Sequence, residues 1–295
     1  MPAYLSHAIM GEDLYHQVAQ NDHLFRVPIQ LSELKAFCLG QDLSLFSGQL
    51  NHYDSHNQKT RIFFIHLIQY IKENNLKEDS TTMALLYGHI AHYFFDVTAH
   101  PFIYSIQSNC NAKQFISSHT LIEGFISSYL SESILKKDYM SIKEDYLGVL
   151  NLSNQNVIAT LKNVYLSTYK DKNVLLSYKA IFNAFKALEK LIQTPSFITK
   201  DFLVKKTNFL QFLEENQLDR SDLINEFHLP WKNIHNEEVH FESLLELYYQ
   251  AITKTIEAIH EVNKYIYDNN KTVSLEHIFN DLSYDTGLPC LKKKR

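Results

Sequence analysis

Glycine, proline and cysteine are scarce in this chain of 295 residues, which contains seven Gly, six Pro and three Cys. Because glycine and proline mark turns, so few of them disfavour a sheet protein with many tight connections. Long stretches are instead rich in Leu, Lys, Glu, Ala and Gln, which favour helices. We therefore expect an all-α protein with little or no β-sheet.

The cysteines are odd in number and have no regular spacing, since they stand at Cys38, Cys110 and Cys290. A disulfide framework and a cysteine-rich metal site are therefore both disfavoured. We expect reduced thiols that are mostly buried.

Long apolar runs and an excess of basic charge are also missing. No segment approaches the roughly 18 apolar residues of a membrane-spanning helix, and the N-terminus lacks the pattern of a signal peptide. We therefore expect a cytoplasmic protein. A net charge of −5 and a pI near 6.3 provide no general attraction for nucleic acid or anionic membranes. The basic run at 292–295 is expected to be a solvated tail.

Apolar residues recur at helical spacing along most of the chain. This pattern predicts helices at about 11–22, 31–38, 58–75, 81–99, 112–136, 150–168, 173–193, 198–215, 241–269 and 274–282. The clearest apolar stripe begins at Phe241. The segment at 41–58 is polar, contains Gly48 and is predicted to be a loop.

The histidines are concentrated in the first part of the chain, where ten of the fifteen lie within residues 1–119. We therefore predict a metal-binding helical core over 1–140. Residues 141–295 are predicted to form a helical C-terminal extension that packs on this core, without a flexible linker between them.

The most informative segment contains GHIAHYFFDVTAHP and, farther along, SHTLIEGF. His92, Asp96 and His100 lie at about 0°, 40° and 80° around a helix, so they share one face. His119 and Glu123 repeat the four-residue spacing. Such nitrogen and oxygen ligands suit zinc better than manganese or iron.

A single histidine–carboxylate pair at this spacing is more typical of a surface hydrogen bond. Two pairs together with His100 favour a metal site instead. The neighbours include Tyr93, Phe94 and Phe95, and unpaired polar groups among apolar residues are costly to bury. Pro101 disfavours helix at His100, so we expect the helix to end or kink there and to turn His100 toward a second ion.

These motifs are part of a resemblance that runs nearly end to end. The chain resembles the zinc-dependent phospholipase C family, in its branch of small, intracellular bacterial homologues. The matching motifs are MPAYLSHAIMGED, GQDLSLF, HNQKTRIFF, GHIAHYFFDVTAHPFIY, SHTLIEGF, HLPWKNIHNEEVHFESLLELYYQA and SYDTGL. The resemblance implies a multi-helix bundle like that of the zinc-dependent phospholipases C and nucleases. It also implies that a metal-activated water attacks a phospholipid-like phosphodiester.

The resemblance also implies a set of zinc ligands for two or three ions. One ion would lie among Asp42, His56, His92 and Asp96, and another among His100, His119 and Glu123. His7 would join Asp96 at a third. Asp42 is the candidate for orienting or deprotonating the attacking water.

Several residues have alternative interpretations. Asp42 could instead cap a following turn, and His52 lies in the same polar segment as His56. His66 falls in the apolar run IFFIHLIQY and is expected to be a core residue. His89 is on the helix of His92 and is a candidate for orienting a ligand rather than binding metal.

Two other functions are compatible with this pattern. A zinc-dependent single-strand nuclease is the nearest enzymatic alternative, since abundant aromatic residues can stack on bases. The other is a non-enzymatic interaction protein in which metal ions join the helices. A catalytic zinc keeps an open coordination position, whereas a structural zinc is closed by protein ligands.

Overall fold

The computed structural model describes residues 4–19, 24–42, 52–110, 115–137, 154–169, 211–268 and 273–290. Within these ranges nearly all regular structure is helical, and the one sheet has two antiparallel strands. The prediction of an all-α fold is confirmed.

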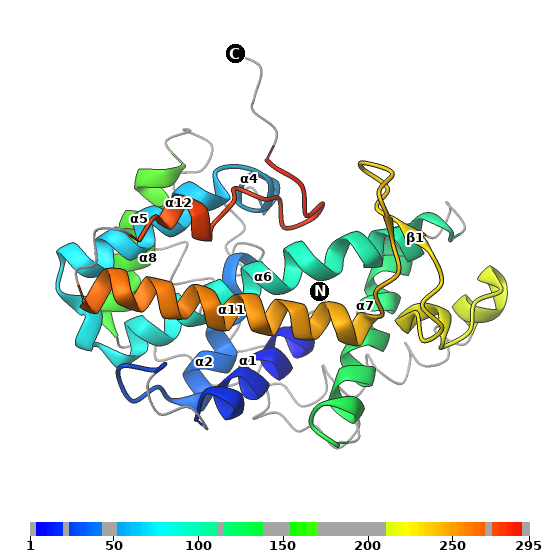
Figure 1. Cartoon of the computed structure of the whole chain (residues 1–295), viewed down its shortest axis with the longest axis horizontal. Coiled ribbons are helices and arrows are strands. Elements are labelled where there is room, and N and C mark those ends of the chain that lie inside the picture. Colours follow the sequence, from blue (N-terminus) through cyan, green and yellow to red (C-terminus); the bar gives the residue numbers. More distant parts are fainter. Residues whose placement is uncertain are drawn as a thin grey trace, which may run out of the picture.

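The elements follow one another along the chain as shown in Figure 1. The helices are α1 (Tyr4–Ala19), α2 (Leu31–Phe37), α4 (His52–Asn57), α5 (Thr60–Glu73), α6 (Ser80–Ser108), α7 (Phe115–Ser133), α8 (Gln155–Thr168), α11 (Leu244–Tyr267) and α12 (Leu275–Ile278). The 3₁₀ turns are η1 (Gly40–Asp42), η2 (Leu76–Glu78) and η7 (Asp222–Ile224). The strands β1 (Trp231–Lys232) and β2 (Val239–His240) form a hairpin near the C-terminal end of α6.

Helix α6 is the centre of the fold. It has 29 residues, most of them buried, and it packs against α11, α2, α1 and α7. Figure 1 shows α11 running alongside it. The contact includes a buried hydrogen bond of 2.8 Å from Tyr87 Oη to Asn263 Oδ1. In the described part of the chain no helix, α6 included, has the length and apolar character to cross a membrane.

Several helix predictions agree with the structure to within a few residues, notably α2, α5, α7 and α8. Helix α1 begins well before the predicted 11–22, because its first turns carry Ser6 and His7 on a buried face and so break the apolar pattern. Helix α12 is shorter than the predicted 274–282. The helix predicted at 173–193 and most of that at 198–215 lie outside the described residues.

The start of α11 differs from the predicted position. Ser243 accepts a hydrogen bond from the Glu246 amide, and the Glu246 carboxylate accepts one from the Ser243 amide. This capping box starts the helix at Leu244. Phe241 therefore precedes the helix and is 54% exposed, so it does not belong to the buried stripe.

The sequence predicts that the helix ends or kinks at Pro101, and the predicted end is wrong. Helix α6 continues through Pro101 to Ser108. Proline cannot donate to the Val97 carbonyl and costs stability inside a helix. Burial of the helix on several sides outweighs this local preference.

The loop predicted at 41–58 is also wrong at both of its described ends. Asp42 ends the turn η1, and His56 lies on the short helix α4. Six residues are too few to show an apolar period, so the sequence HYDSHN does not predict a helix. Residues 43–51 lie outside the described ranges.

Asp79 joins the beginnings of two helices. Its carboxylate accepts a hydrogen bond of 2.9 Å from the Thr82 amide and so caps α6. It also accepts hydrogen bonds from the side chains of Asn154 and Asn156 at the start of α8. Burial alone would raise the pKa of Asp79, but the hydrogen bonds from Asn156, Thr82 and Asn154 outweigh it and hold the pKa below its ordinary value.

We expect Asp79→Ala to lower the free energy of unfolding by about 1 kcal/mol, as loss of a helix cap does. Because the folded-state pKa is lowered, the carboxylate stabilises the protein above its unfolded pKa of about 3.9, and this contribution disappears as the pH falls through the folded value. Urea unfolding at neutral and acidic pH measures both effects. Glu257→Ala, on the exposed face of α11, is the matched control. Equal midpoints for the two variants at neutral pH would contradict the capping role.

Candidate metal centre

The structure brings all eight predicted ligands together from five elements. They are His7 on α1, Asp42 on η1, His56 on α4, His92, Asp96 and His100 on α6, and His119 and Glu123 on α7. They form three groups in which the nitrogen and oxygen atoms all lie within 4.8 Å of one another. These groups are His7–Asp42–His92, His56–His92–Asp96 and His100–His119–Glu123.

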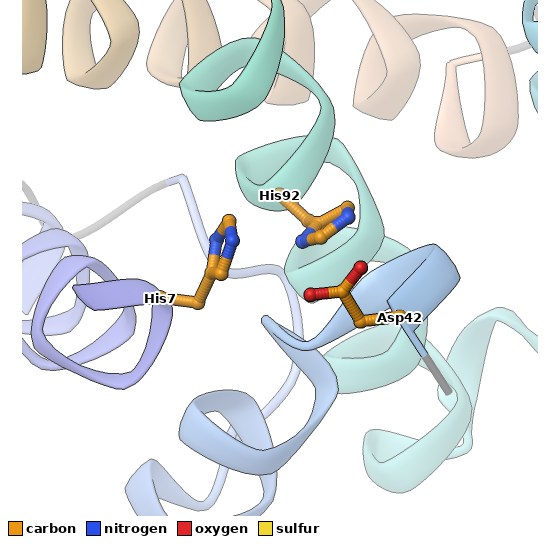
Figure 2. Close-up of side chains that lie close together, drawn as sticks. All are labelled: His7, Asp42 and His92. Atoms are coloured by element: carbon orange, nitrogen blue, oxygen red, sulfur yellow. The ribbon is translucent and has the colours of Figure 1, made fainter. Parts of the chain in front are cut away.

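The first group joins three distant segments of the chain. Figure 2 shows the side chains of His7, Asp42 and His92 pointing toward one another. His7 and His92 are almost fully buried, and their rings lie 4.3 Å apart between centroids. These three side chains, each of which can bind a metal ion, therefore lie in one enclosed space.

The tight turn before Asp42 makes this arrangement possible. Gly40 has a φ of +45°, and a Cβ atom there would lie 2.4 Å from Cγ of the His92 ring. Only glycine combines this backbone conformation with so close an approach. The turn thus places Asp42 next to His92, although the two are 50 positions apart.

Asp42 of the first group lies beside His56 of the second group. His56 Nε2 lies 3.1 Å from Asp42 Oδ1, and Ser55 Oγ lies 3.2 Å from His56 Nδ1. Burial alone would raise the pKa of Asp42, but the hydrogen bond from His56 and the neighbouring imidazoles hold it well below its usual range. Asp42 is therefore an ionised carboxylate at neutral pH.

Asp96 lies between the groups. Its Oδ1 is 3.3 Å from His7 Nε2, and its Oδ2 is 3.2 Å from His92 Nε2. The same Oδ1 is 3.9 Å from His100 Nδ1. A carboxylate whose two oxygen atoms face different imidazoles is placed to bridge two cations.

The third group is the more open one. Glu123 Oε1 lies 3.0 Å from His119 Nε2 and 3.5 Å from His100 Nε2. The side chain of His119 is 24% exposed and that of His100 is 12% exposed, whereas His92 is fully buried. The half-buried ring of Tyr104 lies beside both imidazoles, 5.1 Å from His119 and 5.8 Å from His100. Within the described residues, this group is therefore more exposed to solvent than His92.

Three of the imidazoles are oriented in the same way through Nδ1. This atom lies 3.1 Å from the Cys38 carbonyl oxygen in His92, 2.8 Å from the Tyr284 carbonyl oxygen in His100, and 3.1 Å from Gln107 Oε1 in His119. Because a carbonyl oxygen only accepts hydrogen bonds, each Nδ1 is the donor. In the neutral ring, Nε2 then carries a lone pair, as in metal-binding histidines.

These lone pairs point at carboxylates, which also only accept hydrogen bonds. Nε2 of His92 faces Asp96, and Nε2 of His119 faces Glu123. Such pairs need a proton or a metal cation between them. In the described part of the chain His92 Nε2 and His7 Nδ1 are buried without a hydrogen-bond partner. The donor set and these unpaired nitrogen atoms fit a zinc ion.

The pKa shifts in the third group also indicate that a positive charge is needed beside its carboxylates. Burial would lower the pKa of His100, but Asp96 and Glu123 outweigh it and raise the pKa to about 10. Burial would raise the pKa of Glu123, but His119 and His100 hold it well below its usual range. The carboxylates thus favour a positive charge between them, either a proton on His100 or a metal cation.

The other histidines have different surroundings. His89 Nδ1 lies 2.9 Å from the Leu85 carbonyl, and its ring stacks on Phe63. Its role in orienting a ligand stays a prediction. His66 Nδ1 lies 2.9 Å from Thr168 Oγ1, so it has a partner outside the centre. The side chain of His52 is outside the described atoms.

Sequence reasoning did not find the groups that orient the imidazoles. The carbonyls of Cys38 and Tyr284 belong to the backbone, which any residue carries, so residue type gives no signal for them. Gln107 is seven residues after His100 on the same helix face, and this spacing was a usable signal.

A family of proteins described as zinc dependent phospholipase C has a sequence model that matches residues 6–173. The match covers more than half of the chain and includes all eight candidate ligands. It ends before the β1–β2 hairpin and α11. No curated protein and no solved structure gives a significant match.

Asp96→Asn removes one negative charge from the position between the groups, so we expect metal content to fall and stability to decrease with it. Elemental analysis and thermal unfolding of the purified protein measure the two effects. His66→Gln is the matched control on α5 and should retain the metal content of the parent. Unchanged metal in Asp96→Asn would count against a bridging position.

Gly40→Ala places a methyl group where the His92 ring now lies. Displacement of that ring should weaken metal binding by about tenfold or more, in the range found when the groups that orient a ligand are altered. Competition with a chelator of known zinc affinity measures the change. An affinity equal to that of the parent would show that η1 does not set the position of His92.

Proposed function

Because the chain belongs to the zinc-dependent phospholipase C family, we propose that it is a zinc-dependent phosphodiester hydrolase. Its substrate is a phospholipid or a related phosphodiester. The observation that supports this most directly is that Nε2 of His92 and Nε2 of His119 face the carboxylates of Asp96 and Glu123. Such pairs need a proton or a metal cation between them.

The proposed ligand sets combine residues of the three geometric groups. One zinc ion would lie among Asp42, His56, His92 and Asp96, a second among His100, His119 and Glu123, and a third would use His7 with Asp96. Asp96 lies near both His92 and His100, which belong to different proposed sets, and this supports ions that are close together. Closely spaced ions suit phosphodiester cleavage because they act on both the attacking and the leaving oxygen.

Zinc, when bound, supplies positive charge for the phosphate oxygens and lowers the pKa of water. The chain itself provides orientation. The Asp42 carboxylate, with one oxygen held by His56, accepts a hydrogen bond from the attacking water and directs it toward phosphorus. Removing this acceptor would leave the water without a fixed direction.

The open side of the centre supports an enzyme rather than a purely structural metal site. His100 and His119 are partly exposed, whereas the imidazoles behind them are closed in. A substrate phosphate reaches the centre past Tyr104, whose hydroxyl group is a hydrogen-bond donor for a phosphate oxygen. A structural zinc would be closed by protein ligands on all sides.

Charge favours a lipid-like phosphodiester over a nucleic acid. With a net charge of −5 the chain has no general attraction for a polyanion. A single phosphodiester needs only the local positive charge of the metal centre. A direct comparison of a phospholipid and a nucleic acid as substrates tests this preference.

We expect the protein to contain two or three zinc ions by elemental analysis and to hydrolyse a short-chain phosphatidylcholine. Glu123→Ala should lose zinc together with activity. Asp42→Asn keeps the size of the side chain and should lower kcat by about a hundredfold or more, as loss of a positioned acid–base group does. Single-stranded DNA is assayed in parallel at several salt concentrations. A zinc-loaded parent that cleaves neither substrate class, nor a soluble phosphodiester, would leave the structural-metal interpretation in place.

A further inference from the structure

The chain ends, within the described residues, in a compact segment that we call the strap, residues 281–290. It folds back on itself through the hydrogen bonds Ser283 N to the Leu288 carbonyl (2.8 Å), Gly287 N to the Ser283 carbonyl (2.9 Å) and Cys290 N to the Asp281 carbonyl (2.8 Å). Figure 1 shows it in red beside α4. It lies more than a hundred residues beyond the end of the family match at residue 173.

Tyr284 connects the strap to two of the candidate ligands. Its amide donates a hydrogen bond of 2.9 Å to the carbonyl of His56, and its carbonyl accepts one of 2.8 Å from Nδ1 of His100. The His56 and His100 side chains belong to different ligand groups. One residue of the strap therefore touches both sides of the centre.

The side chain of Tyr284 reinforces this contact. It is fully buried, and its ring lies 5.0 Å from the His56 ring and 5.4 Å from the His92 ring. The imidazoles are thus packed against the strap as well as hydrogen-bonded to it.

Polar side chains hold the strap on α4 and α5. Asn57, the residue after His56, accepts a hydrogen bond of 2.6 Å from Ser283 Oγ and donates one of 2.6 Å to Asp285 Oδ2. Thr60 Oγ1 donates to the Leu282 carbonyl at 2.9 Å. These bonds set the position of the strap independently of the imidazoles.

The strap also fits closely against α6. Gly287 has a φ of +65°, and a Cβ atom there would lie 2.6 Å from the Val97 carbonyl oxygen and 2.9 Å from Pro101 Cγ. The strap could not lie this close to the helix with any larger residue at that position.

From these contacts we infer that the strap is a working part of the metal centre and that Tyr284 is a positioning residue for His56 and His100. Groups that hydrogen-bond a ligand imidazole fix its orientation and tautomer and strengthen metal binding. Zinc binding and docking of the strap are then coupled, and each favours the other. This inference rests on the metal site of the proposed function but not on the substrate.

The test uses the full chain with Gly287→Ala, which pushes the strap away from α6 and leaves every candidate ligand in place. Zinc affinity, measured by competition with a chelator, should fall about 10- to 100-fold. The visible absorption of cobalt(II) bound in place of zinc should also change, since it reports ligand geometry. Glu276→Ala, on the exposed side of α12, is the control and should match the parent in both measurements.

A measurement on the parent does not depend on how the variant folds. Hydrogen exchange at the Tyr284 and Gly287 amides should slow when zinc is added. Equal exchange with and without zinc, or equal zinc affinity in Gly287→Ala and the parent, would overturn the inference. These results are separate from those on activity, because a parent that binds zinc without hydrolysing any phosphodiester removes the proposed function and leaves the coupling intact.

Discussion

The central constraint in this structure is that buried carboxylates face imidazole nitrogen atoms that carry lone pairs. Asp96 and Glu123 accept hydrogen bonds only, and the Nδ1 bonds of His92 and His119 leave Nε2 as an acceptor too. Two acceptors 3.0–3.2 Å apart repel each other unless positive charge lies between them. The rest of the fold serves to keep these groups out of water, where the charge would otherwise be screened. One metal cation between these groups would remove the repulsion, whereas protons would be needed on several imidazoles to do the same.

Regular helices and irregular backbone have different roles in building the centre. Helix α6 provides three candidate ligands at four-residue spacing, and its burial gives them a rigid base. The orientation of those ligands comes largely from elsewhere, through the Cys38 carbonyl near η1 and the Tyr284 carbonyl in the strap. A helix can space side chains along one face, but it cannot bond to the far side of their rings. Segments that are distant in the sequence are needed for that.

The contrast between helical spacing and orientation by distant backbone explains how much of the site the sequence could predict. The spacing of His92, Asp96 and His100 is a local property of one helix, so it was visible, and the resemblance to a family added residues such as His56 that no spacing connects to α6. The turn at Gly40 and the strap act through backbone atoms and close approach, which residue types do not encode. The sequence predicts a loop at His56 because α4 is too short to show an apolar period. The helical class followed from composition, whereas the division into a core over 1–140 and an extension stays a prediction.

The wrong prediction of a helix end at Pro101 has a structural explanation. The proline removes the hydrogen bond that residue 101 would otherwise donate to the Val97 carbonyl, and this favours an end of the helix. In the folded chain the same position is where the backbone of Gly287 approaches most closely. The strap thus covers the part of α6 whose hydrogen bonding is incomplete, immediately after His100, and in the same place its Tyr284 carbonyl orients that imidazole. The strap therefore contacts α6 at the proline and orients His100 in the same place, although these segments are far apart in the sequence.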